Sequence, residues 1–248
     1  MGSAVAAEWV KVRSVRSTWL TLAGFAAVSI GLGYMTGGSF ANADRQNDML
    51  AANFLGLLLG QLVLIMFAVA NVGSEYSTGT IGPSLAAVPS RGRFLAAKMT
   101  VVGLTVAVAA LVVELTTFAV VQQRLGERGS SPTEWTTIEA LLGGWMHLTL
   151  LSLFAAAVTA MLRSTVTALS VLLPVLFLSS QGLGNVEAVR PVAQYLPDQV
   201  GMVIMHITVP GDPQFGRDYG AWTGIGILVL WTAAALIGAW ASARGKDA

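Results

Sequence analysis

The sequence predicts an all-α membrane protein with six transmembrane helices, an N-terminal interfacial helix and short re-entrant helices before the last span. Of its 248 residues, 54% are hydrophobic and only 11% are charged, whereas a soluble domain carries about 25% charged residues. Several charge-free runs reach the about 20 apolar residues that a helix needs to cross about 30 Å of hydrocarbon. These runs are continuous rather than alternating, which argues against a β-barrel.

The expected spans form one membrane domain without a soluble one. Only the third span is interrupted by a charge, at Glu114. The first span follows basic residues but has no clear cleavage pattern, so we expect an uncleaved helix rather than a signal peptide. The six spans are expected near residues 18–36, 51–72, 98–121, 139–162, 165–181 and 221–241.

Loop charges predict that both termini lie in the cytoplasm. With the N-terminus inside, nine basic residues fall on the cytoplasmic side and five on the outer side. An excess of basic residues marks the cytoplasmic side of a membrane protein. Eleven of the fourteen basic residues are arginine, a bias typical of high-GC bacterial genomes. We therefore expect a multi-pass protein of a bacterial plasma membrane.

Residues 3–17, before the first span, are expected to form a short helix in the cytoplasmic interface. An apolar stripe that ends in an arginine supports this helix: Val5, Trp9, Val12 and Arg16. Its candidate lipid-contacting and charged residues are Glu8, Trp9, Lys11, Arg13 and Arg16. The alternative is a disordered basic leader whose charges only set the orientation.

Residues 182–220, before the last span, are long for a loop and not uniformly polar. The charge-free run Gln199–Gly211 is too short to cross a bilayer. Pro191, Pro197 and Pro210 punctuate the longer segment, and each is an expected helix boundary. Runs of this length suit re-entrant or interfacial helices. The alternative is an ordinary extracellular loop with an apolar turn packed on the spans.

Small residues at four-residue spacing predict close helix packing. They occur in three spans, as the pairs Gly33/Gly37, Gly56/Gly60 and Gly220/Gly224. Gln61 in the second span and Pro174 in the fifth are weaker signals. We expect Gln61 to bond a neighbouring helix and Pro174 to kink its own helix.

The segment "NVGSEYSTGTIGPSLAAVPSRGRFLAAKM", from Asn71 to Met99, lies on the predicted cytoplasmic side. Its glycines and prolines exclude one long helix but allow short pieces, at Ser84–Val88 and after Ser90 as an N-cap. We expect the segment to present four side chains near the membrane: Glu75, Tyr76, Arg91 and Arg93. The alternative is that Arg91, Arg93 and Lys98 only set the topology and contact lipid phosphates.

This segment resembles the first cytoplasmic loop of ABC-2-type transporter permeases. The likeness lies in "GSEYSTGTI…SLAAVPSRGRFLAAK", an E-Y/F-x-x-G-T-I motif followed by L-x-x-x-P-x-x-R. The leader "EWVKVRSVRSTWLTL" and the late segment "YLPDQVGMVI" are similar to parts of the same family, so the resemblance covers the whole chain. Gly82 departs from it, because a basic residue commonly follows G-T-I. This chain therefore lacks that contact or supplies it from Arg91 or Arg93.

The resemblance implies the membrane subunit of an ATP-driven exporter. Two copies, or one copy with a homologous permease, would form the pathway, and two separate ATPase subunits would bind ATP and Mg. The loop near residues 73–97 would dock on the ATPase through Glu75, Tyr76, Gly79, Thr80, Ile81, Pro89, Arg91 and Arg93. No G-x-x-x-x-G-K-[ST] occurs in the sequence. We therefore expect a non-enzymatic subunit, without a metal or cofactor of its own and without a nucleic-acid partner.

Two polar residues inside spans are candidates for a cargo pathway. Glu114 lies deep in the third span and His147 at a similar expected depth in the fourth, and intramembrane ionisable residues are candidates for function. We expect them to face each other or the central pathway. The alternative is a structural Glu114, protonated or bonded to Thr116, Thr117 or water.

The leading interpretation is an exporter of a hydrophobic or amphipathic cargo, such as a drug, antibiotic, peptide or lipid-linked molecule. A secondary transporter or channel would predict inverted repeats and several midplane charges, which we do not find. An intramembrane enzyme is disfavoured because no H-E-x-x-H or G-x-S-x-G motif occurs. A membrane anchor that regulates an ATPase stays open as an alternative.

Overall fold

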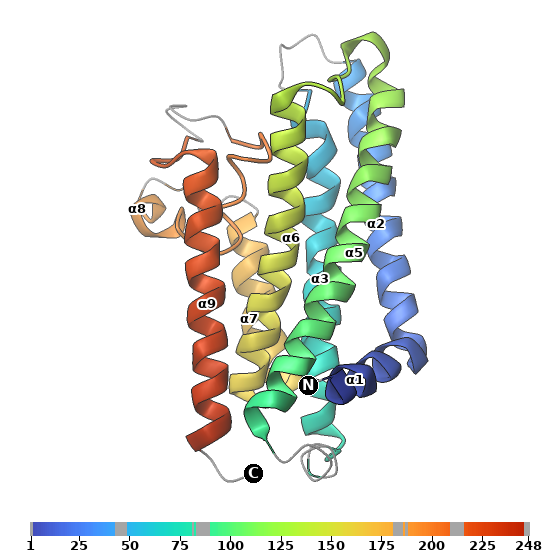
Figure 1. Cartoon of the computed structure of the whole chain (residues 1–248). Coiled ribbons are helices and arrows are strands. Elements are labelled where there is room, and N and C mark those ends of the chain that lie inside the picture. The colour runs from blue at the N-terminus through green and yellow to red at the C-terminus, as the bar shows by residue number, and fades with distance from the viewer. Residues whose placement is uncertain are drawn as a thin grey trace.

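The computed structural model describes residues 2–42, 49–80, 82, 90–180, 186, 188–208 and 216–245. This part of the chain is helical and contains no strand. Its elements, in chain order (Figure 1), are α1 Gly2–Ser14, α2 Arg16–Ala41, α3 Ala51–Ser77, α5 Arg91–Leu125, η1 Gly126–Arg128, α6 Trp135–Leu162, α7 Thr165–Ser180, α8 Arg190–Ala193 and α9 Ala221–Gly245. The prediction of an all-α membrane protein is thus confirmed.

In the part of the chain that the structure describes, five helices are long and apolar enough to cross a membrane: α2, α3, α5, α6 and α9. Helix α7 has 16 residues, so at about 1.5 Å per residue it is about 24 Å long, shorter than about 30 Å of hydrocarbon. The sixth span therefore stays a prediction. Pro174 lies inside α7, as the sequence indicates.

The loop predicted at residues 73–97 is shorter than expected, because both flanking helices continue into it. Gly73 does not end α3, which continues to Ser77. Gly73 is instead a packing position, because its missing side chain leaves room for Thr165 at the start of α7. Gly92 likewise lies inside α5, beside the indole of Trp240. Ser90 precedes α5 as expected but makes no capping hydrogen bond. The expected short helix at Ser84–Val88 lies outside the described residues.

Helix α3 is the central helix of the bundle and packs against α2, α5, α6 and α7. Glycines permit its closest approach, as predicted from their spacing. A Cβ at Gly56 would clash with the backbone of Ser29 in α2, and one at Gly60 with the Ser29 hydroxyl. On the other side of α2, a Cβ at Gly33 would lie 2.6 Å from Thr117 Cγ2 of α5.

The third glycine pair behaves differently from the other two. Gly220 has open space where a Cβ would be, so it permits no close contact. Gly224 lies against the carbonyl of Val200, in the segment before α9, and not against another spanning helix. The prediction of helix–helix packing is therefore wrong for this pair, because loop backbone fills the position where a neighbouring helix was expected.

Helix α1 lies across one end of the bundle, called the α1 end below, where α9 also ends (Figure 1). Five of the six exposed tryptophans lie near the two ends of the bundle, and the sixth, Trp231, lies in the interior of α9. Trp9, Trp19 and Trp240 are near the α1 end, and Trp135 and Trp222 are at the start of α6 and α9, at the opposite end. Tryptophan is enriched at membrane interfaces, so these side chains mark two interfacial levels. The side of the membrane on which each end lies stays a prediction.

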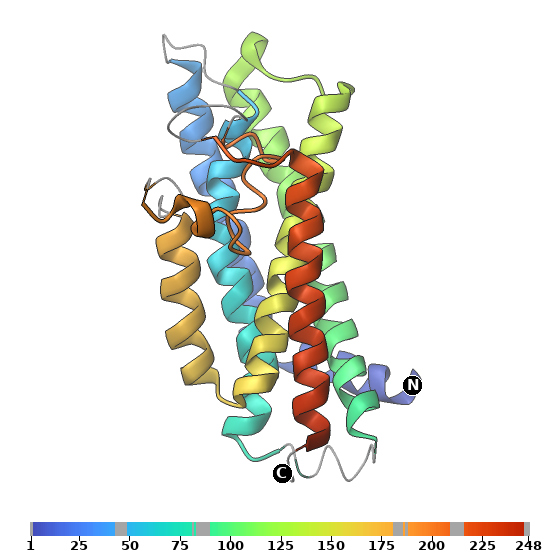
Figure 2. The ribbon, with the colours of Figure 1, turned by 90° about the vertical axis from the view of Figure 1, so that its left-hand side faces the viewer.

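The segment 188–208 turns into the bundle between α3 and α9 (Figure 2). Among these residues only α8 is a regular helix, and consecutive turns follow it, so the expected re-entrant helices are not confirmed. Its apolar residues are nevertheless buried, including Val200 and Ile204. A Cβ at Gly143 of α6 would clash with Ile204, and one at Gly201 with the His147 ring. The segment therefore packs closely against α6.

Candidate functional site at the α1 end of the bundle

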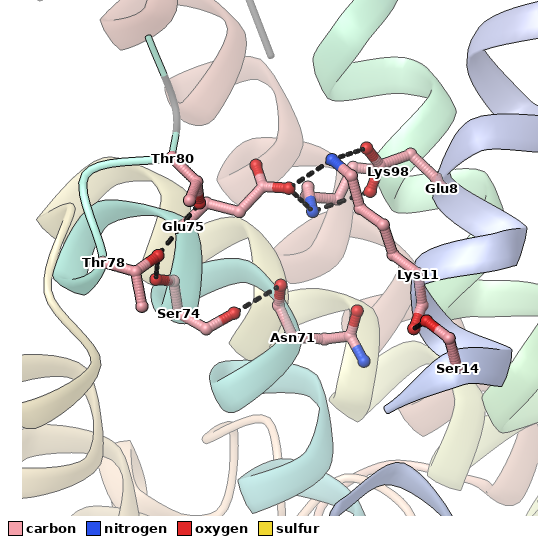
Figure 3. A network of polar contacts seen from close by, with 9 residues as sticks. All are labelled: Glu8, Lys11, Ser14, Asn71, Ser74, Glu75, Thr78, Thr80 and Lys98. Atoms are coloured by element: carbon pink, nitrogen blue, oxygen red, sulfur yellow. Dashed lines mark hydrogen bonds and ion pairs between the residues drawn. The ribbon is translucent and has the colours of Figure 1, made fainter. Parts of the chain in front are cut away.

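Four charged side chains from three helices form a closed ring of ion pairs at the α1 end (Figure 3). We call these residues, Glu8, Lys11, Glu75 and Lys98, the charge cluster. Lys98 Nζ lies 2.7 Å from Glu8 Oε2 and 3.0 Å from Glu75 Oε1. Lys11 Nζ lies 2.6 Å from Glu8 Oε1 and 2.6 Å from Glu75 Oε1. Each lysine thus bridges the same two carboxylates, and the formal charges of the four residues cancel.

Three members of the charge cluster are withdrawn from solvent. The side chains of Glu8, Glu75 and Lys98 are 5%, 8% and 4% exposed, whereas that of Lys11 is 43% exposed. Burying a charge is costly unless a partner and hydrogen bonds compensate it. Removing one partner from such a group leaves an uncompensated buried charge. The cluster therefore favours one relative position of α1, α3 and α5.

The aromatic ring of Phe94 completes the packing of both lysines. It lies one turn before Lys98 on α5 and is itself buried. Lys98 Nζ lies 5.6 Å and Lys11 Nζ 5.7 Å from its ring centroid. Ammonium groups at this distance are attracted to the face of an aromatic ring. Phe94 therefore stabilises the ammonium groups of Lys11 and Lys98 in addition to the two carboxylates.

The ion pairs shift two pKa values outside the spanning helices. Burial opposes the charge of Glu8, but the Coulombic attraction of Lys98 and hydrogen bonds from Lys11 and Lys98 outweigh it, so the pKa of Glu8 lies below its ordinary value. Burial likewise opposes the charge of Lys11, but hydrogen bonds to Glu75 and Glu8 raise its pKa. Both groups are therefore charged at neutral pH.

The end of α3 places Glu75 in the cluster. The backbone N–H and the hydroxyl of Thr78 both donate to the Ser74 carbonyl, at 2.9 Å and 2.7 Å. Gly79 follows with φ +69°, a left-handed conformation that favours glycine after a helix. Helix α3 therefore ends at Ser77, and Glu75 lies in its last turn, directed at α1 and α5.

Two arginines bond the last turn of α9 to the start of α5 and to the end of α6. Arg91 Nη1, at the start of α5, donates to the carbonyl of Ala243 at 3.3 Å. Arg163 Nη2, just after α6, donates to the carbonyl of Ser242 at 3.1 Å. The two ends of the segment between α3 and α5 are thus bonded to α1 and to α9.

The segments that form this site match a known family. A family model described as "ABC-2 family transporter protein" matches residues 4–182, which is most of the chain. The chain belongs to the ABC-2 family of transporter proteins. No curated protein matches the chain. Permeases of this family are in general non-catalytic membrane subunits that work with an ATPase subunit.

The predicted coupling residues of this ABC-2 permease occupy different environments. Glu75 is buried in the charge cluster rather than presented outward, and Tyr76 is half-buried. Gly79, Thr80 and Arg93 are exposed. Arg91 is partly buried and bonded to α9. Ile81 and Pro89 lie outside the described residues.

The N-terminal residues form a helix as predicted, and the face that it turns to the bundle contains Glu8. Helix α1 buries Ala4, Glu8 and Val12, while Trp9 is 48% exposed. Arg13 is exposed. The predicted stripe does not continue to Arg16, because the backbone is extended at Val15 and Arg16 begins α2. The ion pairs of Glu8 with Lys11 and Lys98 explain this orientation, since the bond to Lys98 of α5 requires that face to point inward.

Glu114 and His147 are both buried in the permease but do not bond each other. His147 Nε2 lies 3.2 Å from Gln61 Oε1 of α3, which confirms the interhelical bond expected of Gln61. Glu114 faces Gly144, one turn before His147, and its carboxyl oxygens have no hydrogen-bond partner among the described residues. The Thr116 and Thr117 hydroxyls donate to carbonyls of their own helix instead. A role in the cargo pathway stays a prediction.

Sequence analysis missed two features of the permease. It took Lys98 only as a topology signal, although the residue lies on the buried face of α5. It also missed a polar network before α9, in which Arg217 Nη2 donates to Gln199 Oε1 at 2.9 Å and Gln199 Nε2 donates to Asp198 Oδ2 at 2.9 Å. Burial raises the pKa of Asp198 to about 7, against the opposing effects of Gln199 and Arg217. The sequence signal that could have indicated this network is the pair Asp198-Gln199, a carboxylate next to an amide at the start of the charge-free run.

Proposed function

We propose that this permease is the membrane subunit of an ATP-driven exporter that moves a hydrophobic or amphipathic cargo out of a bacterial cell. Two copies, or one copy and a homologous permease, enclose the pathway in the plasma membrane, with both termini in the cytoplasm. Two separate ATPase subunits bind ATP and Mg and dock against residues 78–90, between α3 and α5. Drugs, antibiotics, peptides and lipid-linked molecules are the cargo classes that this function accommodates.

The observation that carries this proposal is the set of contacts that surrounds the proposed docking segment. The charge cluster joins the last turn of α3 to α1 and to the first turns of α5. The Arg91 bond joins α5 to the end of α9. A force applied by an ATPase to residues 78–90 would therefore reach four helices at once, instead of bending a free loop.

Replacement of residues 80–89 by a Gly/Ser linker of equal length tests the proposal. This replacement leaves the described charge cluster and the start of α5 intact, unlike one that begins at Glu75. The matched control replaces residues 127–133, at the opposite end of the bundle, by the same type of linker. Affinity-tagged permease is purified from membranes of the native host, and ATP hydrolysis by the eluate is measured.

We expect ATPase activity to co-purify with the native chain and with the 127–133 variant, and to be lost with the 80–89 variant. Equal ATPase activity with both variants would place docking elsewhere. Purified permease that moves solute along an ion gradient in liposomes without an ATPase would favour a secondary transporter.

A further inference from the structure

The segment 188–208 reaches deep into the bundle from the end opposite α1 (Figure 2). Gly201 packs against the His147 ring, and Ile204 packs against Gly143. Because α6 begins at Trp135, His147 is twelve residues into that helix, about 18 Å from its start. Residues that form consecutive turns rather than a regular helix thus occupy a place inside the bundle.

Hydrogen bonds join this segment to α9 and to the residue that leads into it. The Tyr219 hydroxyl donates to the carbonyl of Gln194 at 2.6 Å, and Trp231 Nε1 of α9 donates to the carbonyl of Tyr195 at 2.9 Å. The two contacts with α6 described above are steric, since each depends on the missing side chain of a glycine. The segment can therefore separate from α6 while it stays bonded to α9.

A carboxyl group with an incomplete set of partners lies within this segment. Asp198 is fully buried. Its Oδ2 accepts a hydrogen bond from Gln199 Nε2 at 2.9 Å, but its Oδ1 has no hydrogen-bond partner among the described residues. An ionised carboxylate offers about four acceptor positions, and burial without partners is costly for a charge. The packed position therefore suits the neutral carboxyl group better than the carboxylate.

The charged and titratable groups that face Asp198, among the described residues, come from two elements. Arg217 Nη2 donates to Gln199 Oε1 at 2.9 Å, so the amide of Gln199 lies between the two charges in this chain of bonds. Tyr219 interacts with Asp198 electrostatically from the same stretch, and His147 belongs to α6. Burial raises the pKa of Asp198 to about 7, although the Gln199 amide, nearby backbone N–H groups and Arg217 lower it.

We propose that protonation of Asp198 keeps the segment 188–208 packed against α6, and that transfer of this proton to water releases the segment from α6. On release the carboxylate reaches water, which supplies the hydrogen bonds that the packed position lacks. The pKa of Asp198 lies above its ordinary value of 3.8. Its contribution to packing is thus fully present below pH 3.8 and is lost as the pH rises through about 7. This switch requires neither an ATPase nor a cargo, so its test is independent of the exporter proposal.

Hydrogen–deuterium exchange of the purified full-length chain in detergent, at pH 5.5 and pH 7.5, tests the switch. The reporters are the amides of Met202, Met205 and His206, which donate to carbonyls of the segment at 3.0, 3.1 and 3.1 Å. Each rate is divided by that of an unstructured peptide of the same sequence at the same pH. Asp198→Asn keeps a neutral side chain of the same shape at both pH values. The matched control, Glu134→Gln, removes an exposed carboxylate just before α6, at the same end of the bundle.

The corrected exchange of these amides should rise about 20-fold from pH 5.5 to pH 7.5 in the native chain and in Glu134→Gln. This magnitude follows because each pH unit between 3.8 and about 7 changes the release equilibrium by up to tenfold. In Asp198→Asn the exchange should be slower than in the native chain and independent of pH.

A rise that persists in Asp198→Asn would assign the pH dependence to another group, such as His147, and would overturn the proposal. Native exchange that does not change with pH would overturn it without reference to any variant. Amides in the middle of α3, measured in the same samples, should exchange equally at both pH values. A parallel rise there would show a general loosening of the bundle and would also overturn the proposal.

Discussion

Lys98 Nζ and Glu8 Oε2 lie 2.7 Å apart, so the third turn of α5 is bonded to a helix that lies across the end of the bundle. Both side chains are almost fully buried. A buried ion pair adds little stability relative to apolar packing, but it strongly disfavours any arrangement in which one charge loses its partner. The pair therefore fixes the position of α1 against the end of the bundle where the docking segment lies.

Removing the charge of Lys98 should strongly destabilise the permease. In Lys98→Met, Lys11 alone faces two buried carboxylates, and we expect a loss of about 3–5 kcal/mol in the free energy of unfolding. Arg93→Met removes an exposed cation from the same helix and should change it by less than about 0.5 kcal/mol. Denaturant unfolding in detergent measures both. Equal stability of the two variants would contradict the role given to the charge cluster.

The cluster also predicts the direction of the pH dependence. Because the pKa of Glu8 is lower in the folded chain than its ordinary value of 4.5, its stabilisation is present above pH 4.5 and is lost as the pH falls through the lowered pKa. The pKa of Lys11 is raised above its ordinary value of 10.5 in the folded chain. The stabilisation by Lys11 is therefore fully present below pH 10.5 and is lost as the pH rises through the raised pKa.

Stability measured between pH 7 and pH 3 tests this prediction by comparison with Glu8→Gln. The variant should be less stable at pH 7, and the difference from the native chain should shrink on acidification. A difference that is constant over this range would show that the Glu8 carboxylate is not stabilised by its partners.

The close approach of α2 and α3 requires glycine at position 60. A Cβ there would clash with the Ser29 hydroxyl, so Gly60→Ala should destabilise the chain by about 1–3 kcal/mol through overpacking. Gly31→Ala is the control, because no atom lies within 4 Å of its would-be Cβ. It should be neutral or stabilising, since alanine favours helix. Similar losses in both variants would show that helix contact is not the cause.

The segment before α9 should detach from α6 when Gly201 acquires a side chain. A Cβ at this position would clash with the His147 ring, so Gly201→Ala should expose residues that are now buried. The chain has no cysteine, and Met205 is 1% exposed, which makes Met205→Cys a specific reporter. We expect faster maleimide labelling of Met205→Cys with Gly201→Ala than with the control Gly226→Ala, whose Cβ would meet open space.

The spanning helices could be predicted from sequence because hydrocarbon imposes one requirement, a long apolar run, on each of them. Their ends could not be predicted as well. Gly73 and Gly92 look like helix breakers, but each is a packing position against Thr165 or Trp240. Among the residues of this segment that the structure describes, only Gly79, at φ +69°, has the left-handed conformation that follows a helix end. Local sequence does not distinguish these two uses of glycine.

The charge cluster was only partly predictable. Its residues were each visible as unusual charges, but Lys11 and Glu75 are 64 positions apart, and their pairing depends on how α1 folds back across the bundle. The apolar stripe predicted a helix in the membrane interface, but it gave no sign that Glu8 would face the bundle. The burial of Glu8 depends on cationic partners that local sequence does not identify.

Site-specific photocrosslinking in living cells tests the central claim most directly. Benzoylphenylalanine is placed at Thr80 or Arg93, which are exposed at the α1 end, and at Ser131, at the opposite end of the bundle. We expect Thr80 and Arg93 to give adducts with a partner that binds immobilised ATP, and Ser131 to give none. An ATP-binding adduct at Ser131, or none at Thr80 and Arg93, would contradict docking of an ATPase at the α1 end.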